Sequence, residues 1–364
     1  MKIDFANLRL AYKEHKDEFD EAIDEVIKSS SFIMGKQVFE LEKKLARFSG
    51  AKHAIACSNG TDALLLAMMA IGVKPGDEII TTPFTFIATA ETIAFLGAIP
   101  VFVDIDERTY NIDVVKIEEK ITVKTKAIMP VSLYGQLSDM DPINEIALRY
   151  DLDVIEDGAQ SFGATYKGKK SCNLSTIGTT SFFPAKPLGC FGDGGAVFTN
   201  DDQLAEKMSS LRVHGQTKRY HHQYIGMGGR LDTLQAAVLN VKMNYYENDI
   251  SRRKIAANYY TNLLKNEVIT PYVEEYNSSV WAQYSIRVKD RDVIQAGLKE
   301  KGIPTAVHYP KPLHLQDCFQ YLGYKLGDFP ISENVSNEIM SLPLNPYLTN
   351  QEQEYICKEL INIL

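Results

Sequence analysis

Short apolar runs alternate with helical patterns along the first half of the chain, and this alternation restricts the fold more than any other feature. The runs HAIACS, AIPVFVDI, KAIMPVSL and DLDVIEDG each have the length of one strand. Between several of them lie stretches with a helical spacing of apolar residues, such as Ile143–Tyr150. Strands that alternate with helices form βαβ units. The sequence therefore predicts an α/β protein with a mainly parallel sheet between helices.

The second half departs from this pattern. Apolar residues from Leu231 to Tyr245 recur every three or four positions, and the helix that they predict continues through Tyr259. We place a domain boundary inside it, with a larger domain over 1–246 and a smaller C-terminal α/β domain over 247–364. The same patterns predict a helix over 34–48 that ends at Gly50, a half-exposed strand in VWAQYSIRV, a helix over 292–301, a strand in TAVHYP and a closing helix over 351–364.

Composition excludes several classes of protein. Lys and Arg number 39 and Asp and Glu 47, for a net charge of −8, which argues against broad nucleic-acid binding. The start of the chain lacks the apolar core of a signal peptide, and no apolar run approaches the roughly 20 residues that span a bilayer. The cysteines are odd in number, widely spread and without a CxxC pair, so they predict neither a disulfide framework nor a zinc site. We expect a cytoplasmic protein that binds no nucleic acid, no membrane and no metal.

A turn between the first predicted strand and its helix could bind a phosphate. Asn59, Gly60, Thr61 and Asp62 lie there, and in a parallel sheet such a junction is at the carboxyl edge, where ligands bind. The helix start offers free N–H groups and the positive end of the helix dipole. Gly60 permits a close backbone approach, and the Thr61 hydroxyl adds a donor. An ordinary helix-capping turn is the other interpretation.

A carboxylate follows another of the predicted strands. Asp157 comes directly after the apolar run Val154–Ile155, so it should emerge at the same sheet edge. An unpaired buried charge is costly, so it must be solvated or hold a cation, a protonated ring nitrogen or a helix N-terminus. The competing interpretation is that Asp157 or Glu156 caps the next helix.

A lysine lies in a loop with many glycines between two further strands. The segment TTSFFPAKPLGCFGDGGAVFTND places Lys186 between Pro184 and Pro187, ahead of Gly189, and the glycines permit tight backbone geometry. Desolvation there would lower the pKa of Lys186 and make it a nucleophilic amine, although most lysines are solvated surface residues. The GxxxxGK[ST] pattern of a phosphate P-loop is absent.

The three segments together suit pyridoxal phosphate. This cofactor needs an anion site for its phosphate, an acid beside its pyridine nitrogen and a lysine for its aldehyde. An acid partner keeps the ring nitrogen protonated, so the ring can accept electrons. The turn, the aspartate and the lysine occur along the chain in that order.

The chain resembles the DegT–StrS family of sugar aminotransferases, which are fold-type I enzymes that use pyridoxal phosphate. The likeness runs from the helix at Met34 to HYPKPLH and MSLPLNPYLT, and SFFPAKPLGCFGDGGAVFTND is its most specific part. It implies a large domain with a seven-stranded type of sheet, a smaller C-terminal domain and a homodimer with the active site at the interface. A dehydratase branch carries His at the lysine position, and Lys186 argues against that branch.

The resemblance also implies roles for individual residues. Lys186 matches the lysine that binds the cofactor aldehyde, and Asp157 matches the partner of the ring nitrogen. Phe86, in TPFTFIAT, matches an aromatic that stacks on the ring, although it could instead be a plain core residue. The positions that match cofactor contacts are Gly60, Thr61, Phe86, Asp157, Gln160, Ser181 and Lys186.

One position departs from the family pattern. Family members carry an Asn two residues before the Arg of RLD, and it reaches the phosphate bound by the other subunit. In IGMGGRLDTLQAA this position is Gly228. A backbone N–H or a residue in the loop Gln216–His222 must then replace the contact. This basic loop could also meet a nucleotide diphosphate.

Within the family, the chain most resembles the branch of UDP-2-acetamido-2-deoxy-3-oxo-glucuronate aminotransferases of bacterial O-antigen synthesis, on EDGAQSFGATYKGKKSCNLSTIGTTSFFPAKPLGC, RLDTLQAA and GIPTAVHYPKPL. A uronate carboxylate needs a cation, which Arg230 could supply, and His308 and Tyr309 could bond the sugar. Alternatively, Arg230 pairs with a nearby carboxylate such as Asp232, and Tyr309 belongs to the core.

The resemblance implies that an amino donor, expected to be L-glutamate, supplies the nitrogen and that a UDP-linked 3-keto sugar accepts it. Three other functions remain open from the sequence, of which an aminotransferase for a 4-keto sugar is one. Another is an aminotransferase for a dTDP-linked 3-keto-6-deoxyhexose, which has no carboxylate and would leave Arg230 with a structural role. The third is a non-catalytic regulator that binds the same cofactor.

Overall fold

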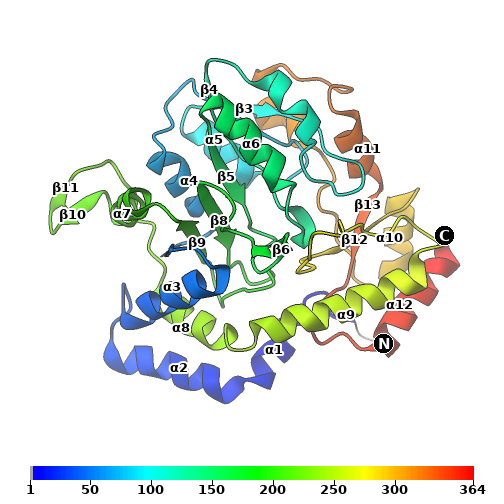
Figure 1. Ribbon diagram of the computed structural model, residues 1–364. Helices are drawn as coiled ribbons and strands as arrows, with labels where there is room; N and C mark the ends of the chain where they lie inside the picture. The colour runs from blue at the N-terminus through cyan, green and yellow to red at the C-terminus, as the bar shows by residue number, and fades with distance from the viewer. Residues whose placement is uncertain (1–2) are drawn as a thin grey trace.

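The computed structural model describes residues 3–364 and has a seven-stranded sheet at its centre (Figure 1). The strand order is β1-β9-β8-β5-β4-β2-β3. Only β9 runs antiparallel to its neighbours, so the predicted mainly parallel sheet is confirmed. The strands are β1 (His53–Cys57), β2 (Glu78–Thr81), β3 (Ile99–Phe102), β4 (Thr125–Ile128), β5 (Asp153–Asp157), β8 (Ile177–Ser181) and β9 (Gly195–Thr199).

Helices cover both faces of this sheet, as the alternating pattern predicts. On one face, α4 (Gly60–Ala70), α5 (Ala88–Phe95) and α7 (Asp202–Leu211) share one apolar core with the strands. On the other face, α3 (Lys36–Ser49) and α8 (Thr233–Lys242) pack on the β1–β9 end, and α6 (Met140–Tyr150) packs nearer β4. The predicted stop of α3 is confirmed, because Gly50 takes the left-handed conformation at φ +80°.

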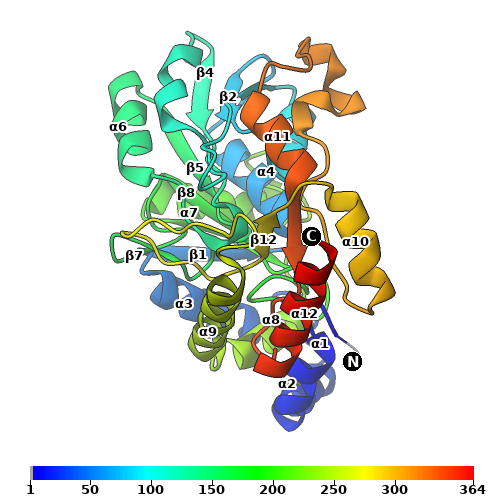
Figure 2. The same cartoon turned by 90° about the vertical axis from the view of Figure 1, so that its right-hand side faces the viewer.

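The C-terminal part has a separate core. Helices α9 (Tyr246–Leu264), α10 (Arg291–Glu300) and α12 (Asn350–Ile363) enclose β12 (Tyr284–Arg287) and β13 (Ile339–Leu342), and α9 lies beside α12 (Figure 2). The prediction of a half-exposed strand in VWAQYSIRV is wrong, because every residue of β12 is buried. The division into 1–246 and 247–364 stays a prediction.

Two other expectations are corrected. The helix predicted from Leu231 through Tyr259 is two helices, since α8 ends at Lys242 and α9 begins at Tyr246 after a turn. TAVHYP is not a strand. Its one ladder contact is the bridge between Ala306 and Ser341, because β13 pairs along its length with β12 instead.

Smaller elements complete the chain. The remaining helices are α1 (Leu8–Glu14), α2 (Lys16–Ser29) and α11 (Pro330–Glu338), the remaining strands are β6 (Thr165–Tyr166), β7 (Lys169–Lys170), β10 (Gln216–Lys218) and β11 (His221–His222), and single 3₁₀ turns occupy Val114–Lys116, Glu118–Lys120, Leu133–Gly135, Leu313–Leu315 and Asp317–Leu322. The β10–β11 hairpin projects away from the sheet (Figure 1). Within residues 3–364, the structure contains no helix with the length and apolarity needed to cross a bilayer.

Candidate active site

The carboxyl ends of β1, β5 and β8 meet at one edge of the sheet and bring the predicted cofactor residues together. Helix α4 begins at Gly60, directly after β1, and Asn59 caps it by accepting a hydrogen bond from Asp62 N–H at 2.8 Å. A Cβ atom at position 60 would lie 2.7 Å from Cβ of Ser181 at the end of β8. The capping interpretation of this turn is thus confirmed. It does not compete with anion binding, because the N–H groups of the first helical turn have no partner inside the helix.

Asp157 is the last residue of β5 and is buried. Thr89, from α5, donates its hydroxyl hydrogen to the carboxylate at 2.8 Å, and the N–H of Ala159 donates at 3.2 Å. Burial raises the pKa of Asp157, whereas these two hydrogen bonds and the charge of Lys186 lower it. No helix follows in residues 158–164, so the helix-capping interpretation is wrong.

The neighbouring Glu156 is held by a different set of groups. Its carboxylate accepts hydrogen bonds from Ser171 Oγ and from the N–H of Cys172, each at 2.8 Å. Burial raises the pKa of Glu156 as well. Since successive side chains of a strand point to opposite faces, Glu156 fastens the 171–172 segment and Asp157 is the acid available at the site.

Lys186 lies in the turn after β8, where its N–H donates to the carbonyl of Phe183 at 2.8 Å. The residue is half-buried. Desolvation by the surrounding protein lowers the pKa of its amine to about 8, against the opposing effect of the Asp157 charge. This is the direction expected for the lysine, and at a pKa of about 8 a fraction of the amine is neutral near physiological pH.

Gln160 connects the sheet edge to the C-terminal part. Its side-chain oxygen accepts a hydrogen bond from Tyr134 N–H at 2.8 Å, and its nitrogen donates to the hydroxyl of Tyr309 at 3.1 Å. The Tyr309 ring lies 6.0 Å, centroid to centroid, from the ring of Phe86. The site thus combines residues from both halves of the chain.

The position of Phe86 excludes one of its two interpretations. Its side chain is 53% exposed, whereas Phe84, two residues earlier, is completely buried. Phe84 is therefore the core residue, and the ring of Phe86 borders the site. Tyr309 packs partly on the core that contains Phe84 and also bonds Gln160, and its contact with a sugar stays a prediction.

His308 is held from two sides. Its Nδ1 lies 2.9 Å from Oγ of Ser341, and its carbonyl accepts a hydrogen bond from the hydroxyl of Tyr134. Burial, with a contribution from the Lys186 charge, lowers the pKa of His308 to about 4. The ring is therefore neutral at physiological pH, with Nε2 left for another partner.

Arg230 is half-buried in the segment that leads into α8. Among residues 3–364 it makes no ion pair with Asp232, so that alternative is not realised, and no hydrogen bond joins it to His308 or Tyr309. The adjacent carbonyl of Gly229 accepts a hydrogen bond from Ser58 N–H at 3.1 Å, which places the segment beside the start of α4.

Sequence reasoning missed Thr89 and Tyr134, which hold Asp157, Gln160 and His308. Thr85, in the bend before α5, lies beside Thr89, and the two hydroxyl oxygens are 3.0 Å apart.

The arrangement fits the predicted cofactor on three counts. A helix N-terminus packed against Ser181 could hold a phosphate, the buried Asp157 could hold a protonated ring nitrogen, and the amine of Lys186 is desolvated. The exposed ring of Phe86 offers a flat surface for stacking. Together these groups could bind an aromatic aldehyde phosphate and move protons beside it.

Comparison with known proteins identifies related chains over the full length. The profile of the DegT/DnrJ/EryC1/StrS aminotransferase family matches residues 13–361. A UDP-2-acetamido-2-deoxy-3-oxo-D-glucuronate aminotransferase of Pseudomonas aeruginosa is 52% identical over 361 residues, covering 99% of this chain and 100% of that protein. A pleiotropic regulatory protein of Geobacillus stearothermophilus is 48% identical, covering 99% and 98%. A Bacillus subtilis structure with bound cofactor PMP has a TM-score of 0.92 and 34% identity, covering 100% of this chain and 85% of that one.

Proposed function

The chain belongs to the DegT/DnrJ/EryC1/StrS aminotransferase family, and on this premise we propose that it transfers an amino group from L-glutamate to the 3-keto group of a UDP-linked 2-acetamido-3-oxo-glucuronate. It is a fold-type I aminotransferase that uses pyridoxal phosphate. We place the product in the synthesis of a bacterial surface polysaccharide. The observation that carries the proposal is the pairing of a buried acid, Asp157, with a desolvated amine, Lys186, at one sheet edge.

The cofactor residues divide into those that hold and those that react. Gly60, Thr61 and Ser181 hold the phosphate, and Phe86 lies against the ring. When bound, the cofactor supplies an electron-accepting ring, and Asp157 keeps its nitrogen protonated. Gln160 lies beside the ring hydroxyl, and its bonds to Tyr134 and Tyr309 fix its orientation.

Lys186 has two tasks in the proposed reaction. Its neutral Nζ would hold the cofactor through the aldehyde. When free, the same Nζ would serve as the acid–base group that takes a proton from the donor carbon and gives one to the sugar carbon. A pKa of about 8 suits this role, because a group that both takes and gives a proton works best near the ambient pH.

The substrate assignment rests on the related Pseudomonas enzyme and on three side chains. Arg230 has no acidic partner within the described chain, so its guanidinium can take the uronate carboxylate. His308, with Nδ1 engaged by Ser341, and Tyr309 offer hydrogen bonds to sugar hydroxyls. These substrate roles are proposals for this chain.

The decisive assay compares two acceptors with glutamate as donor. We expect the purified holoenzyme to aminate a UDP-linked 3-keto uronate and not a dTDP-linked 3-keto-6-deoxyhexose, with the product identified by mass spectrometry. Lys186→Ala is the matched control and should yield no product. Turnover of the neutral sugar alone would contradict the uronate assignment.

A non-catalytic regulator is the second candidate, and the likeness to the Geobacillus protein favours it. The same assay separates the two, because a regulator would bind the cofactor without aminating any acceptor.

We also propose a homodimer, since Phe86 and Phe183 each expose about half of their side chains beside the site, where a partner could cover them. Sedimentation equilibrium tests this, and a monomer at catalytic concentrations would refute it.

A further inference from the structure

Two long segments of this acidic chain contain no acidic residue: residues 158–192, which carry Lys186, and residues 207–231. Asp and Glu make up 47 of the 364 residues, yet none occurs from Lys207 to Leu231. This second segment includes α7's last turn, the β10–β11 hairpin and the strand-like return to α8. Its basic residues are Lys207, Arg212, His214, Lys218, Arg219, His221, His222 and Arg230. A stretch without negative charge beside the active site points to an anionic ligand.

Two of these basic side chains converge at Gly228. A Cβ atom at that position would lie 3.2 Å from Cε1 and 3.3 Å from Nε2 of His214, and 3.7 Å from Nη2 of Arg230. The imidazole and the guanidinium therefore share one small region above a glycine that has no side chain to separate them. Within residues 3–364, neither His214 nor Arg230 forms an ion pair with a carboxylate.

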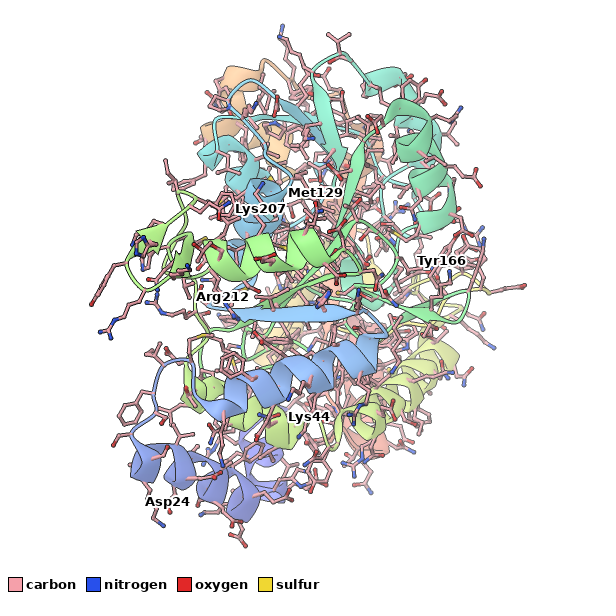
Figure 3. The ribbon with its side chains drawn as sticks, turned by 60° about the vertical axis from the view of Figure 1, so that its left-hand side comes forward. Asp24, Lys44, Met129, Tyr166, Lys207 and Arg212 are labelled. Carbon is pink, nitrogen blue, oxygen red and sulfur yellow. The ribbon has the colours of Figure 1, made fainter. Side chains whose placement is uncertain are left out.

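The backbone around the pair is held firmly. The N–H of His214 donates to the carbonyl of Met227 at 2.9 Å, and His214 keeps a left-handed conformation at φ +63° that is uncommon outside glycine. Two residues earlier, buried Arg212 pairs with Glu42 and donates to the carbonyl of Ala56 in β1 at 2.7 Å. Figure 3 shows Arg212 beside β1. The pair is thus anchored to the sheet although the hairpin beyond it is exposed.

The position of the pair relates it to the active site. The carbonyl of Gly229 accepts a hydrogen bond from Ser58, two residues before the helix start that we assign to the cofactor phosphate. In the single chain Gly228 is exposed and Arg230 is half-buried, so the pair can be reached by a ligand from outside the chain.

We propose that His214 and Arg230 jointly bind one oxyanion of the nucleotide-sugar substrate, a carboxylate or a phosphoryl group. His214 can donate one hydrogen bond and Arg230 two, and the absence of a side chain at Gly228 lets the imidazole and the guanidinium come together over the backbone. This inference rests on the proposed function for the class of substrate. It adds His214 as a residue that positions the anion against Arg230.

The test measures binding and cofactor retention separately. The holoenzymes of wild type, His214→Ala and Arg230→Met are titrated with UDP and with the UDP-linked uronate product by calorimetry, and cofactor content is followed by its absorbance during dialysis. Each substitution should weaken binding of the sugar nucleotide by roughly tenfold or more and leave cofactor content and the melting temperature unchanged. Lys124→Ala, at an exposed lysine just before β4 and so at the opposite end of that strand from the site, is the matched control and should change binding little.

The two titrations distinguish whether the bound oxyanion is a phosphoryl group or the uronate carboxylate. Weaker binding of UDP itself assigns the phosphoryl groups, and weaker binding of the uronate alone assigns the carboxylate; both support the shared site. Wild-type affinity in either variant would overturn it, and so would loss of cofactor with sugar-nucleotide affinity retained. A wild-type enzyme that accepts only another sugar nucleotide would refute the proposed substrate, and the same titrations with that compound would still test His214.

Discussion

The sheet edge around Asp157 and the segment 207–231 both carry the charged groups on which the proposed reaction depends, yet the fold treats them differently. At the sheet edge, burial shifts the pKa of Asp157 upward and that of Lys186 downward to about 8. The hairpin of the other region is exposed, with Tyr220 77% exposed at its tip. The groups that we assign to the cofactor are desolvated, whereas the basic groups of the hairpin remain near water.

Replacement of Lys186 should have the largest effect on turnover. Lys186→Ala should lower turnover by at least about a thousandfold, because the amine that binds the aldehyde and moves the proton is lost. Lys242 is the matched control: burial lowers its pKa to about 8 as well, but its Nζ donates to the carbonyl of Gly189. Borohydride reduction followed by peptide mapping should label residue 186 in wild type and in Lys242→Met. Label at 242 would show that desolvation alone does not select the reacting lysine.

Replacement of Asp157 should have the next largest effect. Asp157→Asn removes the negative charge that keeps the ring nitrogen protonated and should lower the turnover number by about a hundredfold or more. Glu156→Gln should instead lower the free energy of unfolding by about 1 to 3 kcal/mol and change turnover only a few-fold, since Glu156 bonds Ser171 and Cys172. Chemical denaturation and steady-state kinetics of both variants separate the two roles, and equal loss of turnover would remove the distinction.

The pH dependence of cofactor binding to the apoenzyme tests whether the amine of Lys186 is desolvated. Cofactor binding to the apoenzyme needs the neutral amine of Lys186, and desolvation lowers its pKa from 10.5 to about 8. The rate should therefore rise about tenfold per pH unit below pH 8 and level off above it. Asp157→Asn should move the midpoint to lower pH, because the Asp157 charge raises the pKa of Lys186. Stopped-flow absorbance gives the midpoint, and a value near 10.5 would mean that the amine is solvated.

Substitutions of Phe86 and Phe84 should have smaller effects, the first on cofactor retention and the second on the free energy of unfolding. Phe86→Leu should weaken cofactor retention by up to about tenfold with an unchanged melting temperature, because an exposed aromatic contact is lost. Phe84→Leu should lower the free energy of unfolding by about 1 to 2 kcal/mol and leave cofactor affinity alone. Dialysis and thermal melts measure both, and a destabilised Phe86→Leu would return that ring to the core.

The smallest effect is expected on the exposed hairpin. Lys218→Ala should raise the KM for the sugar nucleotide by about two- to threefold at low salt and by nothing measurable at high salt, because a solvated charge is screened. Kinetics at two ionic strengths test this. A salt-independent change would place Lys218 in direct contact with the substrate.

Local patterns predicted most of the elements around the site. The helix that ends at Gly50 and the strand that ends at Asp157 follow from spacing within one segment, whereas the strand predicted over 179–183 lies two residues earlier, at Ile177–Ser181. The exposed face of VWAQYSIRV and the strand in TAVHYP were predicted wrongly, because their burial and pairing depend on β13, which lies more than thirty residues away in sequence. The break between α8 and α9 was missed because the apolar spacing continues across it.

The sequence by itself determined which chemical groups this protein has at its sheet edge, since the strand ends deliver Gly60, Asp157 and Ser181 to one side and the loop after β8 carries Lys186. Only the tertiary structure decided which of two adjacent acids is available, which of two nearby phenylalanines is exposed and which histidine faces Arg230. Periodicity sets the face on which a side chain lies. Its hydrogen bonds, solvent exposure and pKa come from neighbours that are distant in sequence, such as Thr89 for Asp157 and Gly228 for His214.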